Sequence, residues 1–350
     1  MASINKHRKV QPISAPIGNK RRKGLLLINV GTPQSPSTRD VKAYLKRFLN
    51  DPYVIDMPKL LRHILVNGII VPFRAPHSAK RYQKLWTTQG SPLLVHLLHL
   101  QKKLQSKMAE DCQVFAAMNY GQPQLSTVIK EIKAAHIEEL TVLPLYPHYA
   151  KSTTLSAQAA FEHYWDKWQA CQYRFIDAFH NHPAFIAALT QQAKNLNIKN
   201  YDHIVFSYHS LPLKQIREAC ASEQKSHCYK DACYETSVHL AQSLGIKAED
   251  YSTTFQSGLS KKWLSPFTAD ELKNLAKQGK KKVLVFTPSF VADCLETTVE
   301  IGMEYRDMFI EQGGESLDLV PCVNASDSWV EAILEIIQTQ NSHTTSEALE

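Results

Sequence analysis

Short apolar runs alternate with amphipathic stretches along most of the chain. The apolar runs are rich in Val, Ile, Leu and Phe, which is typical of strands buried on both faces of a parallel sheet. The stretches between them follow the 3.6-residue period of helices. This alternation predicts an α/β fold with parallel sheets and right-handed crossovers. The predicted strands lie at residues 24–31, 113–120, 139–146, 171–178, 202–209, 250–257, 281–288 and 317–324, and the clearest helices at 123–135, 182–195, 233–244 and 269–278.

The second series of strands repeats the first. Agreement of several segments in the same order predicts two related Rossmann-like halves, each a parallel sheet flanked by helices, that face each other across a cleft. The corresponding segments are Leu27–Pro33 with Phe206–Pro212, Asn119–Gly121 with Gln256–Gly258, Leu143–Tyr146 with Thr287–Phe290, and Phe179–Ile186 with Val323–Val330. The predicted division is a basic disordered tail over 1–23, halves over 24–180 and 181–340, and a disordered tail over 341–350.

An insertion at about 57–76 separates the first two strands of the first half. Its stretch Met57–Phe73 is apolar but is interrupted by Gly68 and flanked by prolines. Such a stretch is most often buried helix. A lip over a flat apolar ligand, or a shallow membrane contact, is the functional alternative.

The charge of the chain is concentrated in its N-terminal tail. Seven basic residues precede the first strand, and without them the 40 basic residues fall to 33, which balances the 33 acids. The net charge of +7 therefore gives no reason to expect a nucleic-acid partner. The seven residues are Lys6, Arg8, Lys9, Lys20, Arg21, Arg22 and Lys23.

Neither a secretory signal nor a membrane-spanning segment is visible. The tail lacks an apolar run, and no later segment approaches the ~18 apolar residues of a spanning helix. Seven cysteines, an odd number spread over a long chain, suit a reducing compartment better than a disulfide framework. We expect a cytoplasmic protein, with peripheral attachment to the inner membrane as the alternative; the oligomeric state stays open.

The segment Ile204–Pro212 joins an apolar strand to a polar tip at His209. Ligands of open α/β sheets bind outside the carboxyl ends of the strands. His209 is therefore either a reactive group at the cleft or a histidine that caps a turn. In the repeat, Val30 occupies the matching place, so the base or metal ligand belongs to the second half.

Three glutamates follow the strand that ends near Pro288. Glu296, Glu300 and Glu304 recur every four residues and share one helical face, and none has Lys or Arg three or four residues away. A solvated acidic stripe is the ordinary interpretation. A path for protons or a divalent cation that leads to His209 is the alternative, and imidazole with carboxylate suits a borderline metal such as ferrous iron.

Cys220, Cys228 and Cys233 lie close together in sequence. An iron–sulfur cluster normally takes four thiolates, so this set is one short. Free cysteines are the expectation, and a [2Fe–2S] cluster with a further ligand is the alternative. No Cys-x-x-Cys pair and no glycine-rich phosphate loop occurs in the sequence.

Five segments resemble the signatures of ferrochelatase and occur in that family's order, over roughly residues 24–335. The resemblance implies a lyase that inserts Fe²⁺, as a substrate, into protoporphyrin IX with release of two protons, in the last step of haem biosynthesis. It also implies the chelatase fold, two Rossmann-like domains related by pseudo-symmetry. The segments are Ile28–Pro33, Leu143–Thr154, Ser207–Pro212, Phe255–Ser257 and Phe290–Thr297.

The resemblance assigns roles to individual residues. By it, His209 and Glu296 are the catalytic pair that meets iron, and residues 57–73 match a mobile apolar lip. Whether His209 accepts a proton or holds iron stays open. Glu300 and Glu304 match the acidic path, and the wall of the porphyrin pocket matches Tyr120, Tyr149, Ser152 and Thr153.

Some positions depart from the family's pattern. Cys294 stands where many relatives have histidine, and Asn119 where some have arginine. The cysteine trio lies where some relatives bind a [2Fe–2S] cluster. The alternatives are iron insertion into coproporphyrin III, cobalt chelation on sirohydrochlorin, and a non-catalytic tetrapyrrole or iron carrier, against which the unpaired glutamate row argues.

Overall fold

The computed structural model describes residues 21–165, 171–221 and 228–346. All of the predicted strands are present, each starting or ending within a few residues of its expected position. They form two parallel sheets of four strands each. The first contains β1 (Lys23–Asn29), β2 (Cys112–Met118), β3 (Glu139–Pro144) and β4 (Gln172–Phe175); the second contains β5 (His203–His209), β6 (Tyr251–Gln256), β7 (Lys282–Phe286) and β8 (Ser316–Leu319).

The strand order confirms the duplication. It is β2-β1-β3-β4 in the first sheet and β6-β5-β7-β8 in the second, which is the same order in each half. Leu27 pairs with Ala116 and Phe206 pairs with Thr253, as the matched segments predict. In the third strands the match is shifted by one residue. Leu143 pairs with Leu27, and Phe286 pairs with Phe206, so Leu143 corresponds to Phe286 and not to Thr287.

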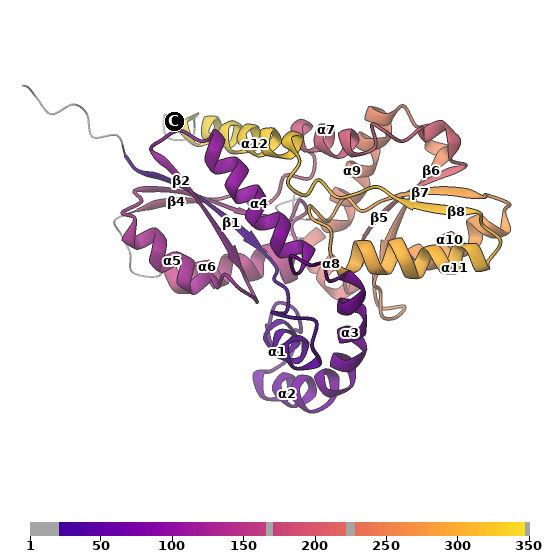
Figure 1. Cartoon of the computed structure of the whole chain (residues 1–350), viewed down its shortest axis with the longest axis horizontal. Helices are drawn as coiled ribbons and strands as arrows, with labels where there is room; N and C mark the ends of the chain where they lie inside the picture. Colours follow the sequence, from indigo (N-terminus) through magenta and orange to yellow (C-terminus); the bar gives the residue numbers. More distant parts are fainter. Residues whose placement is uncertain (1–20, 166–170, 222–227, 347–350) are drawn as a thin grey trace, which may run out of the picture.

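Helices cover both faces of each sheet (Figure 1). Those predicted from periodicity are confirmed as α5, α7, α9 and α10. The first half has α1 (Thr38–Leu49), α2 (Lys59–Ile64), η1 (Leu65–Ile70), α3 (Val71–Leu85), α4 (Pro92–Lys107), α5 (Leu125–Ala134), η2 (Lys151–Leu155) and α6 (Ser156–Trp165). The second has α7 (Pro183–Gln192), η3 (Ile198–Asn200), α8 (Leu213–Cys220), α9 (Tyr229–Leu244), η5 (Ala248–Asp250), α10 (Thr268–Lys277), η6 (Leu295–Tyr305), α11 (Arg306–Glu311) and α12 (Asp327–Ser346).

One apolar core joins the two halves. It extends from Leu27 in β1 to Phe206 in β5 and Trp329 in α12. Figure 1 shows α12 running from the second half back over the first. It packs against α7 of the second half and α4 of the first. The expected C-terminal tail is thus wrong as far as Ser346, because α12 continues to that residue. Most of the expected N-terminal tail, and residues 347–350, lie outside the described residues.

The insertion forms a helical lobe that projects from the sheets (Figure 1). Its inner face, which includes Val66 and Val71, is buried against α1. Its outer face is exposed, so the expectation of a wholly buried helix is wrong. The large apolar side chains that are more than half exposed there are Leu60, Leu61, Ile64, Ile69 and Phe73. Within the described part of the chain, no helix is both long and apolar enough to span a membrane.

Candidate active site

A cavity opens at the carboxyl ends of the strands, between the two halves. It encloses about 1110 Å³ of empty space, part of it open to solvent. Its walls come from the end of β1, from α1 and α3, from the loop after β3, from the end of β5 and from the start of η6. The lining is mostly apolar and aromatic, and His209 and Glu296 both belong to it. The structure therefore brings together the two residues that were expected to form the catalytic pair.

The imidazole of His209 is held in one tautomer. Its Nδ1 lies 2.6 Å from the carbonyl oxygen of Ser210. A carbonyl oxygen only accepts hydrogen bonds, so Nδ1 carries the proton and Nε2 of the neutral ring keeps a lone pair. No described residue hydrogen-bonds to that Nε2. The residue is consequently equipped to accept a proton or to bind a metal ion from the cavity.

Neighbouring side chains fix the backbone of His209. The Tyr229 hydroxyl donates to its carbonyl oxygen at 2.8 Å, and its backbone N–H donates to Ser289 Oγ at 3.1 Å. Tyr229 is buried, and burial raises the pKa of its hydroxyl well above the usual value, so it remains a donor. The helix predicted at 233–244 did not include Tyr229, and only the fold shows that this residue supports the histidine.

Glu296 lies in the first turn of η6, a π-helix that follows β7. The side-chain amide of Gln256 donates to the Glu296 carbonyl oxygen at 2.8 Å and so ties this turn to the end of β6. Gln256 itself pairs with His209 in the sheet register. The motif Phe255–Ser257 is therefore a brace that holds the carboxylate-bearing turn near the histidine-bearing strand.

Two of the three glutamates in the row, Glu300 and Glu304, are paired, contrary to the expectation from sequence. Arg81 of α3 lies 2.9 Å from Glu304 and 3.6 Å from Glu300. Glu300 is buried and also accepts from Ser257 and from Tyr305. The residue that pairs with the row is more than two hundred positions away in sequence, which is why helical spacing could not reveal it. The helix is also a π-helix rather than the expected α-helix.

Two of the three π-helices in the described chain line the cavity. η2 contributes Ser152 and Thr153, and η6 contributes Leu295 and Glu296. The third, η1, belongs to the projecting lobe. A π-turn widens the helix by one residue per hydrogen-bonded ring and is frequent at functional sites.

Two of the four residues expected at a porphyrin wall line the cavity. Ser152 and Thr153 line the cavity, whereas Tyr120 and Tyr149 are not among the described residues that line it. Tyr120 is buried one layer behind, where its hydroxyl contacts Asp51 at 2.5 Å and Ser156 at 2.7 Å. Its matched sequence position therefore marks a support for the wall.

Comparison of the sequence with a family model and with curated proteins gives the same family. The model of the family described as "Ferrochelatase" matches residues 22–341. A ferrochelatase of Legionella pneumophila is 40% identical over 334 residues, covering 91% of this chain and 99% of the relative. One of Coxiella burnetii is 39% identical over 336 residues, covering 91% and 94%. The chain belongs to the ferrochelatase family.

The fold of the ferrochelatase family is shared with other chelatases. The solved structure of SirB from Bacillus subtilis with Fe³⁺ has a TM-score of 0.57 and 8% identity, covering 93% of this chain and 98% of that one. At this identity the likeness concerns the fold alone. The chain is thus a metal chelatase, a lyase that inserts iron into a porphyrin in haem biosynthesis.

The structure places the two residues that depart from the ferrochelatase pattern, Cys294 and Asn119, relative to the cavity. Cys294 is buried and lines the cavity beside Glu296; burial, and then the nearby carboxylate, raise the pKa of its thiol well above normal, so it stays protonated. Asn119 donates to Ser156 and is not among the described lining residues. His148, a histidine that the sequence did not single out, is buried in the cavity wall, and burial lowers the pKa of its imidazole well below normal.

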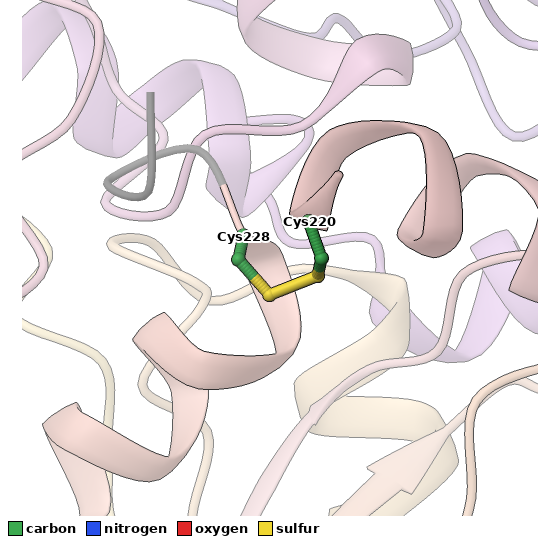
Figure 2. Close-up of a disulfide and its surroundings, with 2 residues drawn as sticks. All are labelled: Cys220 and Cys228. Atoms are coloured by element: carbon green, nitrogen blue, oxygen red, sulfur yellow. A yellow bond between two sulfur atoms is a disulfide. The ribbon is translucent and has the colours of Figure 1, made fainter. Parts of the chain in front are cut away.

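The cysteine cluster is not a set of free thiols. Cys220 at the end of α8 and Cys228 before α9 form a disulfide, with Cα atoms 4.3 Å apart (Figure 2). In this form neither offers a thiolate, and Cys233 is buried within α9. The expectation of free cysteines is therefore wrong for two of the three, because the end of α8 and the start of α9 lie close enough together for the two sulfurs to bond. The cysteines outside the disulfide that the structure describes are all buried.

Proposed function

We propose that the protein inserts ferrous iron into protoporphyrin IX and releases two protons, in the cytoplasm. The observation that carries the proposal is a largely apolar cavity at the junction of the halves, with the Nε2 lone pair of His209 and the carboxylate of Glu296 in its wall. Iron enters as a substrate. The apolar walls suit a flat macrocycle, and the polar groups suit the exchange of two pyrrole protons for a dication.

In this proposal His209 meets the reacting centre. Its Nε2 accepts a pyrrole proton or, between turnovers, holds the cation, since only the neutral imidazole does either. Glu296 faces the same cavity and takes up the second proton or passes the metal. Glu300 and Glu304 continue the path toward solvent, with Arg81 compensating part of their charge.

The lining favours protoporphyrin over coproporphyrin III. Among the described residues that line the cavity there is no lysine and no arginine. Burying a carboxylate without a partner is costly, and coproporphyrin III carries four carboxylates where protoporphyrin IX carries two. The form of the segment Asn29–Pro33 points in the same direction.

An anaerobic assay tests the proposal. Purified protein is offered Fe²⁺ with protoporphyrin IX or coproporphyrin III, and the visible spectrum is followed over many turnovers. We expect protoporphyrin to be metalated faster. His209→Ala should lose metalation by at least about 100-fold while still binding porphyrin, whereas His99→Ala, on an exposed helix face, serves as a matched control. Near-normal turnover by His209→Ala would remove its assigned role, and stoichiometric uptake without turnover would favour a carrier.

The exposed lip supports a further proposal of peripheral membrane contact. Leu60, Leu61 and Phe73 are 72%, 54% and 81% exposed on one lobe, and a patch of this kind on a chain that handles an apolar substrate fits the bilayer interface. Sedimentation with vesicles of phosphatidylethanolamine and phosphatidylglycerol should recover the wild type. The Leu60→Ser/Phe73→Ser variant should stay in the supernatant, and equal recovery of both would count against the contact.

A further inference from the structure

The cavity leaves the carboxylates of its substrate without a partner. If the proposed function holds, on which this inference rests, the bound tetrapyrrole brings two propionate groups. The described lining offers no lysine or arginine, and the only carboxylate-bearing residue in it is Glu296. A buried, unpaired carboxylate is strongly disfavoured, so the propionates must reach the rim, where cationic side chains and water are available.

Two lysines converge at that rim, one from each half. Lys151 opens η2 and directly precedes the cavity-lining pair Ser152 and Thr153. Lys214 lies in the first turn of α8, three residues after Leu211, which also lines the cavity. Each lysine therefore lies a few residues from the cavity lining in sequence, and the two belong to opposite halves of the fold.

A carboxylate of the protein already occupies the space between these lysines. Asp56 Oδ2 lies 3.3 Å from Lys151 Nζ and 3.1 Å from Lys214 Nζ. Asp56 immediately precedes the exposed lip, and its side chain is 45% exposed. The two ammonium groups lower the pKa of Asp56, so the carboxylate remains charged. One carboxylate oxygen of Asp56 thus contacts both ammonium groups, as an oxygen of a bound propionate would.

The contacts of Asp56 are of a kind that a ligand can replace. Lys151 and Lys214 also lie 3.7 and 3.8 Å from Glu218, so the cluster is electrically balanced and has no excess positive charge to attract anions at random. Exposed ion pairs contribute little to stability. An incoming carboxylate that is anchored by the buried macrocycle needs only to exchange with Asp56, which can turn into solvent.

We propose that Lys151 and Lys214 bind a propionate of the tetrapyrrole substrate, and that Asp56 is the displaceable carboxylate that holds them in place when the cavity is empty. The lysines select for a carboxylated macrocycle, and Asp56 competes with it. The proposal predicts opposite changes in substrate affinity for the lysine variants and the Asp56 variant. Removing a lysine weakens substrate binding, and removing the Asp56 charge strengthens it.

The test measures dissociation constants from the Soret band in detergent, with mesoporphyrin IX and with its dimethyl ester. Lys151→Gln and Lys214→Gln should each weaken binding of the diacid by about 3- to 10-fold, and Asp56→Asn should tighten it by about 3-fold, as expected for one charge-assisted contact. The ester should bind all variants equally. Lys130→Gln, an exposed lysine of α5, is the matched control and should change neither constant.

The outcomes separate this inference from the proposed function. If Asp56→Asn weakens binding as the lysine variants do, the cluster only fastens the two halves together, and the inference is overturned. Equal weakening of diacid and ester would show a packing defect and overturn it as well. Wild-type protein that binds the diacid with these signs but never inserts iron would leave the inference standing and overturn the proposed function.

Discussion

Arg81 is the least expected member of the site, and its substitution tests how the glutamate row is stabilised. Replacing it with Met keeps most of the side-chain volume and removes the charge. Glu300, which is only 7% exposed, then loses its cationic partner but keeps its hydrogen bonds from Ser257 and Tyr305. Glu304, whose side chain is 39% exposed, loses a surface ion pair.

The magnitude follows from the two environments. At 3.6 Å and an effective dielectric constant of about 20, the attraction between Arg81 and Glu300 is roughly 4 to 5 kcal/mol before desolvation is subtracted. Partial exposure of Arg81 and the remaining donors to Glu300 reduce the loss to about 2 kcal/mol. The Glu304 pair adds at most about 1 kcal/mol. The buried Nε of Arg81 has no hydrogen-bond partner in the described residues, so its removal stabilises the fold by on the order of 1 kcal/mol and offsets part of the loss.

We therefore expect Arg81→Met to lower the free energy of unfolding by about 2 kcal/mol. Equilibrium urea denaturation at pH 7.5, followed by tryptophan fluorescence, measures it. Glu304→Gln is the matched control and should cost no more than about 1 kcal/mol. In the Arg81→Met/Glu300→Gln double variant, the loss should be smaller than the sum of the single losses by at least about 1 kcal/mol. A loss below about 0.5 kcal/mol, with additive single effects, would refute the argument that Arg81 compensates a buried charge.

Three other outcomes follow from particular contacts. Burial lowers the pKa of His148 well below the usual 6.5, so the folded protein keeps this imidazole neutral while the unfolded chain binds a proton. Stability should therefore fall as pH drops below about 6.5, by up to about 1.4 kcal/mol per pH unit for this group. Urea titrations at pH 5.5 and 7.5 should show a shallower pH dependence of stability in His148→Gln. The disulfide between Cys220 and Cys228 joins residues eight positions apart. Cys220→Ser should therefore lower the free energy of unfolding by about 2.5 kcal/mol in oxidising buffer and leave it unchanged in dithiothreitol. An equal loss in both buffers would contradict this. Tyr229→Phe leaves the His209 carbonyl oxygen without its donor, so we expect about 1 kcal/mol of stability to be lost together with a lower kcat, and unchanged steady-state kinetics would show that Tyr229 does not position the histidine.

The strands could be predicted because each carries its own signal. A run such as Leu25–Ile28 is buried on both faces, and a fully apolar strand of this length has few other stable environments. The same applies to His209, whose place at the end of such a run puts it at the ligand-binding edge before any tertiary contact is known. The duplication could be predicted for a related reason. The two halves have the same strand order, and each therefore carries the same succession of strands and helices along the sequence.

The pairing of charges and sulfurs could not be predicted from sequence. Arg81 reaches Glu304 across 223 positions, and Lys214 reaches Asp56 across 158, through a fold that sequence spacing does not encode. The glutamate row consequently looked unpaired. Cys220 and Cys228 are near in sequence, but whether two nearby cysteines bond depends on how α8 and α9 meet.

Local patterns in the chain were enough to predict the alternation of strands and helices, the doubling of the fold and the strand end that carries His209, because hydrophobic periodicity and the end of a buried strand are local properties. Only the packed fold shows which tautomer His209 adopts, that Tyr120 stands behind the cavity wall, and that Asp56 of the first half pairs with Lys214 of the second. These features depend on which distant side chains share a few ångströms of space, and that is fixed only when the two sheets pack against each other.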